Sequence, residues 1–310
     1  MTVNQKTAQA AACLCPSVYR LAAPHFSELE NKLQEIRLRV ACPAALLCVH
    51  DTYYLTESGG LTDLPCGDLY RVTRGDLDST FQRICDYSVY ARQRELLGGF
   101  ITLRGGHRVG VCGTAVTQNG TIINVRGISS LNIRIAREHR GCGEGVLRRI
   151  GNKGGVLLCG APCSGTTTLL RDLARLLSER GQTVSLIDER GELAAVYDGE
   201  PQNDVGFCDV FNGYPRAQAI EQALRCMSPQ VIICDEIGSE EDALALRQCL
   251  HSGVRVIAAA HAADREELYA RPALREILAT GAFSTLIFLR GRDHAGEIAS
   301  WSREGERRAA

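Results

Sequence analysis

Hydrophobic residues follow two different patterns in the two halves of the chain. In the first half they often alternate with polar residues, as at Ile36, Leu38 and Val40 within residues 29–40, a segment that we expect to begin as a helix and to end as a strand. In the second half, short and wholly apolar runs are separated by longer helical patterns. Such runs are typical of parallel strands that are covered on both faces. We therefore expect two domains with different architectures.

A meander of antiparallel strands is predicted in the middle of the chain. Its segments and turns are residues 100–104, Gly105-Gly106, 107–117, Asn119-Gly120 and 121–125, followed by further alternation at 128–137. An Asn-Gly pair between two alternating segments is the strongest short-range signal for a β-hairpin. The first half is therefore predicted to be a small α+β domain.

The second half is predicted to be an α/β domain in which helices wrap a parallel sheet. Helices are expected at 167–179, where leucines recur on one face and Gly181 follows, and at 240–251, which Gly253 follows. The expected strands are 156–159, 184–187, 231–234, 254–260 and 285–289. Because glycines thin the packing at 141–152, we place the domains at 1–145 and 146–310.

A strand, a glycine-bounded loop and a helix follow one another between residues 156 and 179. The loop resembles the phosphate-binding motif GxxxxGK[ST], in which backbone N–H groups surround the phosphates and the helix N-terminus adds partial positive charge. Thr167 stands at the position of the magnesium-binding hydroxyl. The predicted nucleotide-binding residues of this segment are Gly160, Ala161, Pro162, Cys163, Ser164, Gly165, Thr166, Thr167 and Thr168.

Thr166 occupies the position at which the motif has lysine. That lysine offsets the charge of the β and γ phosphates, whereas threonine offers one neutral hydroxyl. A charge-assisted hydrogen bond contributes roughly 1.5 to 3 kcal/mol, so we expect a nucleotide affinity that is lower by about ten- to a hundredfold. Lys153, the nearest lysine, precedes the strand and lies about 20 Å of extended chain from the loop.

Charged residues also follow other predicted strands. Asp235 and Glu236 follow the apolar run 231–234. In nucleotide hydrolases such a strand places one acid at the magnesium ion and the next beside the attacking water, so we assign these two roles to Asp235 and Glu236. His261 follows the run 254–260, and both a phosphate-sensing and a capping role are open for it. All these strand ends should share the carboxyl edge of one sheet.

Composition and charge narrow the class of function. With 35 basic and 36 acidic residues the net charge is -1, so the chain as a whole has no field that attracts nucleic acid or acidic lipid. No apolar run is long enough to span a membrane, and we expect a soluble or peripheral protein. The 14 cysteines lack the spacing of a zinc site and are expected to be reduced, cytoplasmic thiols.

Taken together, several segments resemble the stage III sporulation protein AA family, which is related to the type II and type IV secretion ATPases. They are LQEIRLRV at 33–40, YSVYARQRELLGGFITLRGGHRVGVCGTAV at 87–116, SSLNIRIARE at 129–138, TTLLRDLAR at 167–175, IDERGELAA at 187–195 and MSPQVIICDEIGSEEDALAL at 227–246. The resemblance covers nearly the whole chain. It implies a RecA-like P-loop ATPase domain, α/β in class, with a smaller N-terminal α+β domain, and ATP and Mg²⁺ as cofactors.

The resemblance also implies partners and further site residues. A homo-oligomeric, six-membered ring is expected, docked at the cytoplasmic face of a membrane through the channel proteins that connect mother cell and forespore. Glu189 lies in a segment that resembles the acidic box of secretion ATPases, and His261 resembles their histidine box. Arg134 and Arg137 are candidates to reach the nucleotide across a domain or subunit boundary, because the guanidinium fork suits phosphate oxygens. Solvated charges on a strand face are the alternative interpretation of both arginines.

Two functions remain open at this stage. The chain is either a motor ATPase of the sporulation channel or a structural ring that binds nucleotide weakly because the lysine is replaced by Thr166. A nucleic-acid-dependent ATPase has less support, since the chain is neutral and only 5% of its residues are aromatic. Nucleic acid is therefore not an expected partner.

Overall fold

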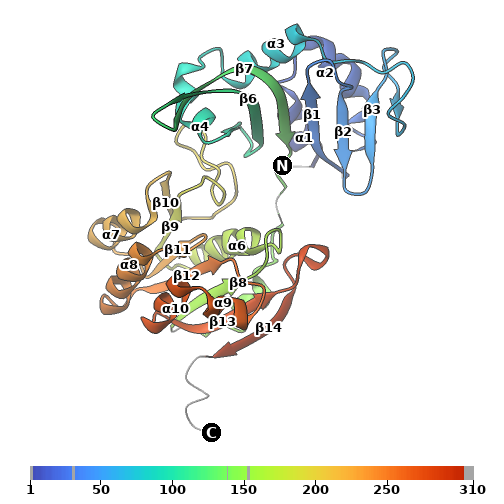
Figure 1. Ribbon diagram of the computed structural model, residues 1–310. Helices are drawn as coiled ribbons and strands as arrows, with labels where there is room; N and C mark the ends of the chain where they lie inside the picture. The colour runs from blue at the N-terminus through green and yellow to red at the C-terminus, as the bar shows by residue number, and fades with distance from the viewer. Residues whose placement is uncertain (1–2, 30–31, 138, 152–153, 304–310) are drawn as a thin grey trace. The chain divides into compact units, whose positions relative to one another are not determined.

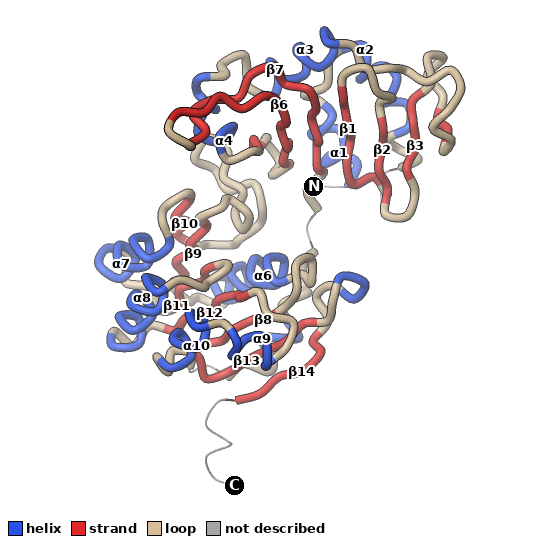
Figure 2. The backbone as a smooth tube through the Cα atoms, in the orientation of Figure 1, coloured by secondary structure: helices blue, strands red, loops and turns tan. Residues whose placement is uncertain are grey.

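The computed structural model describes residues 3–29, 32–137, 139–151 and 154–303. By their internal contacts the residues form two compact units (Figure 1 and Figure 2). The N-terminal unit comprises Met1–Arg137 and Tyr197–Gln202, and the C-terminal unit comprises Glu138–Val196 and Asn203–Ala310. That the chain divides into independent domains at residues 145 and 146 stays a prediction.

The N-terminal unit is built on a seven-stranded antiparallel sheet with the order β4-β3-β2-β1-β7-β6-β5. Ile36 and Leu38 of β1 lie opposite Ile133 and Leu131 of β7, and all four side chains are buried, as their alternation predicts. The strands are β1 (Leu33–Arg39), β2 (Ala45–Cys48), β3 (Thr52–Leu55), β4 (Leu61–Thr62), β5 (Phe100–Thr102), β6 (Arg108–Gln118) and β7 (Thr121–Arg134). The helices are α1 (Val3–Ala11), α2 (Pro16–Ala22), α3 (Arg74–Ile84) and α4 (Gln93–Leu97).

The predicted meander is confirmed, because β5, β6 and β7 pair antiparallel in sequence order. Asn119 and Gly120 form the two-residue turn of the long hairpin, with φ of 51° and 77°. Positive φ at both turn residues matches the right-handed twist of the strands, and asparagine and glycine tolerate it best.

The helical start that we expected for residues 29–40 is wrong for the residues described there. Leu29 lies in a bend and Lys32 in a turn, residues 30 and 31 lie outside the described residues, and β1 begins at Leu33. The amides of Lys32 and Leu33 both donate to the carbonyl of Leu29, which makes a single turn. So short a segment cannot offset the cost of nucleating a helix, whereas β1 gains hydrogen bonds from a strand on each side.

The C-terminal unit has a seven-stranded sheet with the order β10-β9-β11-β12-β8-β13-β14, which is parallel except for β14 at one edge. All five predicted strands are present, whereas β10 and β14 were not predicted. The strands are β8 (Gly155–Cys159), β9 (Val184–Asp188), β10 (Asp209–Asn212), β11 (Val231–Cys234), β12 (Arg255–Ala260), β13 (Phe283–Leu289) and β14 (Ile298–Arg303).

Helices cover both faces of this sheet, as the wholly apolar strands predict. Leu169 and Leu173 of α6 belong to the same buried cluster as Leu158 of β8, while Leu246 of α8 belongs to a second cluster with Leu157 of β8. The helices α6 and α8 lie on opposite faces of the sheet (Figure 1). The helices are α5 (Glu144–Leu147), α6 (Thr166–Glu179), α7 (Arg216–Cys226), α8 (Glu240–His251), α9 (Arg265–Ala270) and α10 (Pro272–Ala279). In this three-layer arrangement the carboxyl ends of the central parallel strands lie side by side at one edge of the sheet.

Candidate functional site

The carboxyl ends of four adjacent parallel strands carry the candidate site. β9, β11, β12 and β8 are neighbours in that order, so the segments that follow them emerge at one edge of the sheet. This edge is where open α/β sheets bind ligands, and the prediction that these strand ends share it is confirmed. Residues 160–165 follow Cys159 of β8 and are called the phosphate loop below. Asp235 and Glu236 follow Cys234 of β11, and His261 follows Ala260 of β12.

The phosphate loop makes tight turns between β8 and α6. Cys163 and Gly165 have φ of 69° and 94°, and a Cβ at Gly160 would lie 2.1 Å from the Ser164 Oγ. Ser164 is fully buried, and its hydroxyl has no hydrogen-bond partner among the described residues. The loop leads directly into the N-terminus of α6, where the first backbone N–H groups have no partner within the helix.

Thr166 and Thr167 form the first turn of α6. The Thr166 side chain is buried. It carries a short, neutral hydroxyl group at the position where the phosphate-binding motif has lysine. The Thr167 Oγ1 donates a hydrogen bond of 3.2 Å to the Asp235 Oδ2 and so joins the phosphate loop to the end of β11. The two residues that we assigned to magnesium are therefore adjacent.

Asp235 is a buried carboxyl group in an acidic environment. Burial, followed by the charges of Glu236 and Glu192, raises the pKa of Asp235 to about 6, despite the hydrogen bond from Thr167. A cation bound by this carboxylate would relieve both effects. The Asp235 Oδ1 also accepts a hydrogen bond of 3.0 Å from the Glu236 amide.

The carboxylate of Glu236 contacts two side chains, those of His261 and Arg190. Its Oε1 lies 2.8 Å from the His261 Nε2, and its Oε2 forms an ion pair with Arg190. The Nδ1 of His261 lies 3.4 Å from the carbonyl oxygen of Gly160, at the start of the phosphate loop. Glu236 has a φ of 43°, a left-handed conformation that turns the chain sharply after β11. His261 thus contacts both the loop and the predicted water activator.

The two acidic residues at the end of β9, Asp188 and Glu189, lie in different environments. Asp188 is buried and accepts hydrogen bonds from the amides of three residues of its own loop, at 2.7, 3.1 and 2.8 Å. Glu189 forms an ion pair of 2.7 Å with Arg216, which also pairs with Asp242 at 2.9 Å. Glu189, predicted to be catalytic, therefore has Arg216 as its partner, and its role in catalysis stays a prediction.

Arg134 and Arg137 belong to the N-terminal unit. Arg134 is exposed and its Nε lies 3.4 Å from the Glu35 Oε1, while the Arg137 Nη2 donates to the Leu33 carbonyl at 2.8 Å. Both arginines thus contact residues of β1. A contact of either with a nucleotide stays a prediction.

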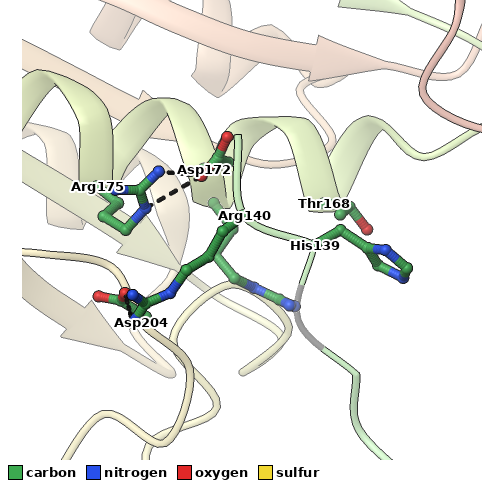
Figure 3. Close-up of a pocket in the computed structure, with 7 residues that line it drawn as sticks. His139, Arg140, Thr168, Asp172, Arg175 and Asp204 are labelled. Carbon is green, nitrogen blue, oxygen red and sulfur yellow. Dashed lines mark hydrogen bonds and ion pairs between the residues drawn. The ribbon is translucent and has the colours of Figure 1, made fainter. Parts of the chain in front are cut away.

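Thr168 faces the segment that enters the C-terminal unit. It lines a cavity of about 10 Å³ together with His139 and Arg140, which is room for about one water molecule (Figure 3). Beside this cavity Asp172 accepts a hydrogen bond of 2.7 Å from the Gly143 amide and pairs with Arg175. These contacts fasten the entering segment to α6, and the predicted role of Thr168 in nucleotide binding stays a prediction.

Sequence reasoning missed two features around the phosphate loop. Arg171 donates from Nε and Nη2 to the carbonyl oxygens of Leu193 and Glu192, both at 2.9 Å, and so ties α6 to the loop after β9. The hairpin loop 290–297 packs on the phosphate loop, where the Gly296 amide donates to the Ser164 carbonyl at 2.7 Å. No local pattern predicts either contact, although Gly291 and Gly296 mark a turn at this place.

The residues of this site fit a magnesium nucleotide in most respects. The Thr167 hydroxyl and the Asp235 carboxylate are hard oxygen ligands of the kind that Mg²⁺ prefers, and they are already adjacent. The two glycines allow close packing of the loop, because a Cβ at Gly160 would collide with the Ser164 Oγ and a Cβ at Gly165 with the Gly296 amide. Thr166 is the one position of the motif that does not fit, because it supplies no charge to the phosphates.

Comparison with known proteins identifies the family. The family model of sporulation stage III, protein AA, matches residues 4–308. The stage III sporulation protein AA of Bacillus subtilis (strain 168) is 37% identical over 266 residues, which are 83% of this chain and 82% of that protein. The chain belongs to the stage III sporulation protein AA family. The resemblance read from the sequence segments is thereby confirmed.

Solved structures show which fold this member of the stage III sporulation protein AA family has. The ATPase DotB of Legionella pneumophila is 18% identical with a TM-score of 0.58, over 89% of this chain and 76% of that chain. The pilus retraction motor PilT with bound ADP is 17% identical with a TM-score of 0.55, over 87% and 77%. The predicted fold class, a RecA-like α/β domain with a smaller N-terminal α+β domain, is confirmed. Within the described residues, no helix is both long and apolar enough to cross a bilayer.

Proposed function

We propose that this chain is the motor ATPase of the sporulation channel between mother cell and forespore, and that it binds and hydrolyses ATP with Mg²⁺. The observation that carries the proposal is the hydrogen bond between Thr167 and Asp235, which brings the phosphate loop to the acidic end of β11. Membership of the stage III sporulation protein AA family and the fold shared with DotB and PilT support it.

In this proposal each residue of the site has one task. Backbone N–H groups of the phosphate loop and of the first turn of α6 bind the phosphates, and Thr167 and Asp235 hold the magnesium ion, which offsets phosphate charge when bound. Glu236 orients and activates the attacking water. Each carboxylate oxygen of Glu236 has one partner, His261 or Arg190, and keeps a further lone pair that can accept a hydrogen bond from the water.

The proposal also includes assembly of the chain into a ring. A hexamer on the cytoplasmic side of the membrane, attached through channel proteins, would let Arg134 and Arg137 reach nucleotide across a boundary once they release Glu35 and Leu33. Glu189, whose Oε2 pairs with Arg216, would contribute to catalysis through its other carboxylate oxygen.

A second function is favoured by one specific observation. Thr166 removes the charge that stabilises the transferred phosphoryl group, so a ring that binds nucleotide but turns it over slowly would serve as a scaffold of the channel. Both functions predict ATP binding, and only the motor predicts hydrolysis.

The test compares ATP hydrolysis by the chain, by Glu236→Gln and by Glu266→Gln, a matched change at an exposed glutamate of α9. For the motor we expect turnover that Glu236→Gln lowers by at least about a hundredfold without loss of ATP binding, while Glu266→Gln has no effect. Binding without turnover above that of Glu236→Gln would support the scaffold. Absence of binding in the chain and also in Thr166→Lys would refute both functions.

A further inference from the structure

The hairpin loop between β13 and β14 is in backbone contact with the phosphate loop. A Cβ at Gly165 would lie 2.8 Å from the amide nitrogen of Gly296 and 3.3 Å from its Cα, and the Gly296 amide donates to Ser164. Gly165 and Gly296 have φ of 94° and 85°, conformations that favour glycine at both positions. Loop 290–297 therefore forms a second wall beside the first turn of α6.

Two of the three basic residues in this loop are paired within it. The Glu297 carboxylate lies 3.7 Å from the Arg290 Nε and 3.6 Å from the His294 Nδ1. Backbone hydrogen bonds from His294 to Gly291 and from Arg290 to Glu297 brace the same turn, at 3.0 and 2.8 Å. The loop is thus a defined turn whose charges are partly neutralised.

Arg292 is the third basic residue and differs from the other two. It begins the 3₁₀ turn Arg292–His294, is exposed, and has no ion pair or hydrogen-bond partner for its guanidinium among the described residues. The hydrogen bond from Arg290 to Glu297 closes the hairpin, so Arg292 belongs to the same short loop as Gly296, whose amide donates to Ser164 of the phosphate loop. A long arginine side chain reaches across such a span.

The charges already at the site show why a further cation is needed. Asp235 and Glu236 are acidic, and Glu192 acts on Asp235 from the loop after β9. The cations beside them are engaged, since Arg190 pairs with Glu236 and Arg171 binds backbone carbonyls. A triphosphate adds more negative charge and meets Thr166 where other phosphate loops present lysine.

We propose that Arg292 binds the β and γ phosphates of the nucleotide in its own subunit and supplies the positive charge that Thr166 does not. The inference rests on the proposed function, because it concerns the same nucleotide site. Arginine suits the task, since its guanidinium is always charged and its fork meets two phosphate oxygens at once. Arg292 is then a binding residue for the phosphates, and the loop 290–297 positions it.

A double-mutant cycle tests this role. The affinity for Mg·ATP is measured by displacement of a fluorescent N-methylanthraniloyl-ATP from the full chain, Arg292→Ala, Thr166→Lys and the double variant. We expect Arg292→Ala to weaken binding roughly 10- to 100-fold in the chain but less than about threefold in Thr166→Lys, where the lysine restores the charge. Arg292→Lys should keep most of the affinity, and Arg275→Ala, a matched change at an exposed arginine of α10, should keep all of it.

Each outcome of the cycle decides between the two proposals. An unchanged affinity in Arg292→Ala, or the same loss in both backgrounds, would overturn the role of Arg292 while the nucleotide site stands. If only Thr166→Lys bound ATP, no residue of the chain would replace the lysine and the role would also be refuted. If neither protein bound ATP, the proposed function itself would fail. Circular dichroism melting of every variant separates lost binding from lost folding.

Discussion

The hydroxyl of Thr167 and the carboxylate of Asp235 lie 3.2 Å apart, although the two residues are 68 positions apart in the chain. Thr167 is in the first turn of α6 and Asp235 follows β11, so their contact depends on the order of the strands in the sheet. The hydroxyl donates a hydrogen bond to the carboxylate. Both oxygens would be available as ligands of the Mg²⁺ ion that the proposed function requires.

Thr167→Ala should therefore weaken ATP binding only when magnesium is present. We expect a loss of about tenfold with Mg²⁺ and little change in EDTA, because the alanine lacks one hard oxygen ligand and alters no phosphate contact. Titration of the nucleotide with and without Mg²⁺ measures both values. Thr167→Ser should behave like the unmodified chain, and an equal loss in Thr167→Ala with Mg²⁺ and in EDTA would show that the hydroxyl of Thr167 does not act through the metal ion.

Asp188 and Glu189 are neighbours in sequence with opposite roles. Asp188 accepts three amide hydrogen bonds, two of them buried, so Asp188→Ala should lower the free energy of unfolding by about 3 kcal/mol, since three donors lose their acceptor. Glu189→Gln should cost less than about 1 kcal/mol, because its ion pair with Arg216 is partly exposed. Urea denaturation followed by circular dichroism compares the two. Similar losses would refute the structural assignment of Asp188.

Long periodic patterns were the most predictable part of the fold. The helix at 240–251 matches α8 at both ends because its apolar face repeats over three turns and Ser239 caps its start. β10 and β14 were missed because they are edge strands without a buried residue, and their pattern resembles a loop. Pairing with neighbouring strands, rather than their own residues, makes them strands.

The candidate site was predictable only as far as its motifs are local. The spacing of Gly160, Gly165 and Thr167 and the strand end at Asp235 predicted a loop and an acidic residue at one edge of the sheet, and Thr167 and Asp235 are in contact there. The ion pair between Arg190 and Glu236 was not predictable, because it joins loops that follow different strands. The same holds for the contact between the loop 290–297 and the phosphate loop, which only tertiary packing produces.

Asp76 should stabilise the N-terminal unit in a pH-dependent manner. Burial alone raises the pKa of Asp76, but hydrogen bonds from Ser17, Thr73 and Tyr70 outweigh it and hold the pKa at about 2. Since this value lies below the ordinary 3.8, the stabilisation is complete above about pH 4 and is lost as the pH falls toward 2.

Asp76→Asn should therefore lower the free energy of unfolding by roughly 2 kcal/mol at pH 7 and by progressively less below pH 4. Urea denaturation at pH 7 and at pH 3 measures the difference. Asp78→Asn is the matched control, because Asp78 lies on the same helix in an exposed pair with Arg74 and should change stability by less than about 0.5 kcal/mol. A constant difference between Asp76→Asn and the unmodified chain across this range would contradict the prediction.

His107 should limit the stability of the N-terminal unit in mild acid. Its side chain is fully buried, its Nδ1 accepts a hydrogen bond of 3.0 Å from the Ala136 amide, and burial together with the charge of Lys6 lowers the pKa of His107 to about 4. In the unfolded chain His107 takes up a proton at about pH 6.5. Its contribution to stability is therefore complete above that pH and is lost as the pH falls toward 4, by up to about 3 kcal/mol.

His107→Asn keeps an acceptor for Ala136 without titrating, so the stability of this variant should fall less between pH 7 and pH 4.5 in thermal melts. His251→Asn, at an exposed position of α8, should leave the slope unchanged, and equal slopes in all three proteins would mean that the proton is bound elsewhere.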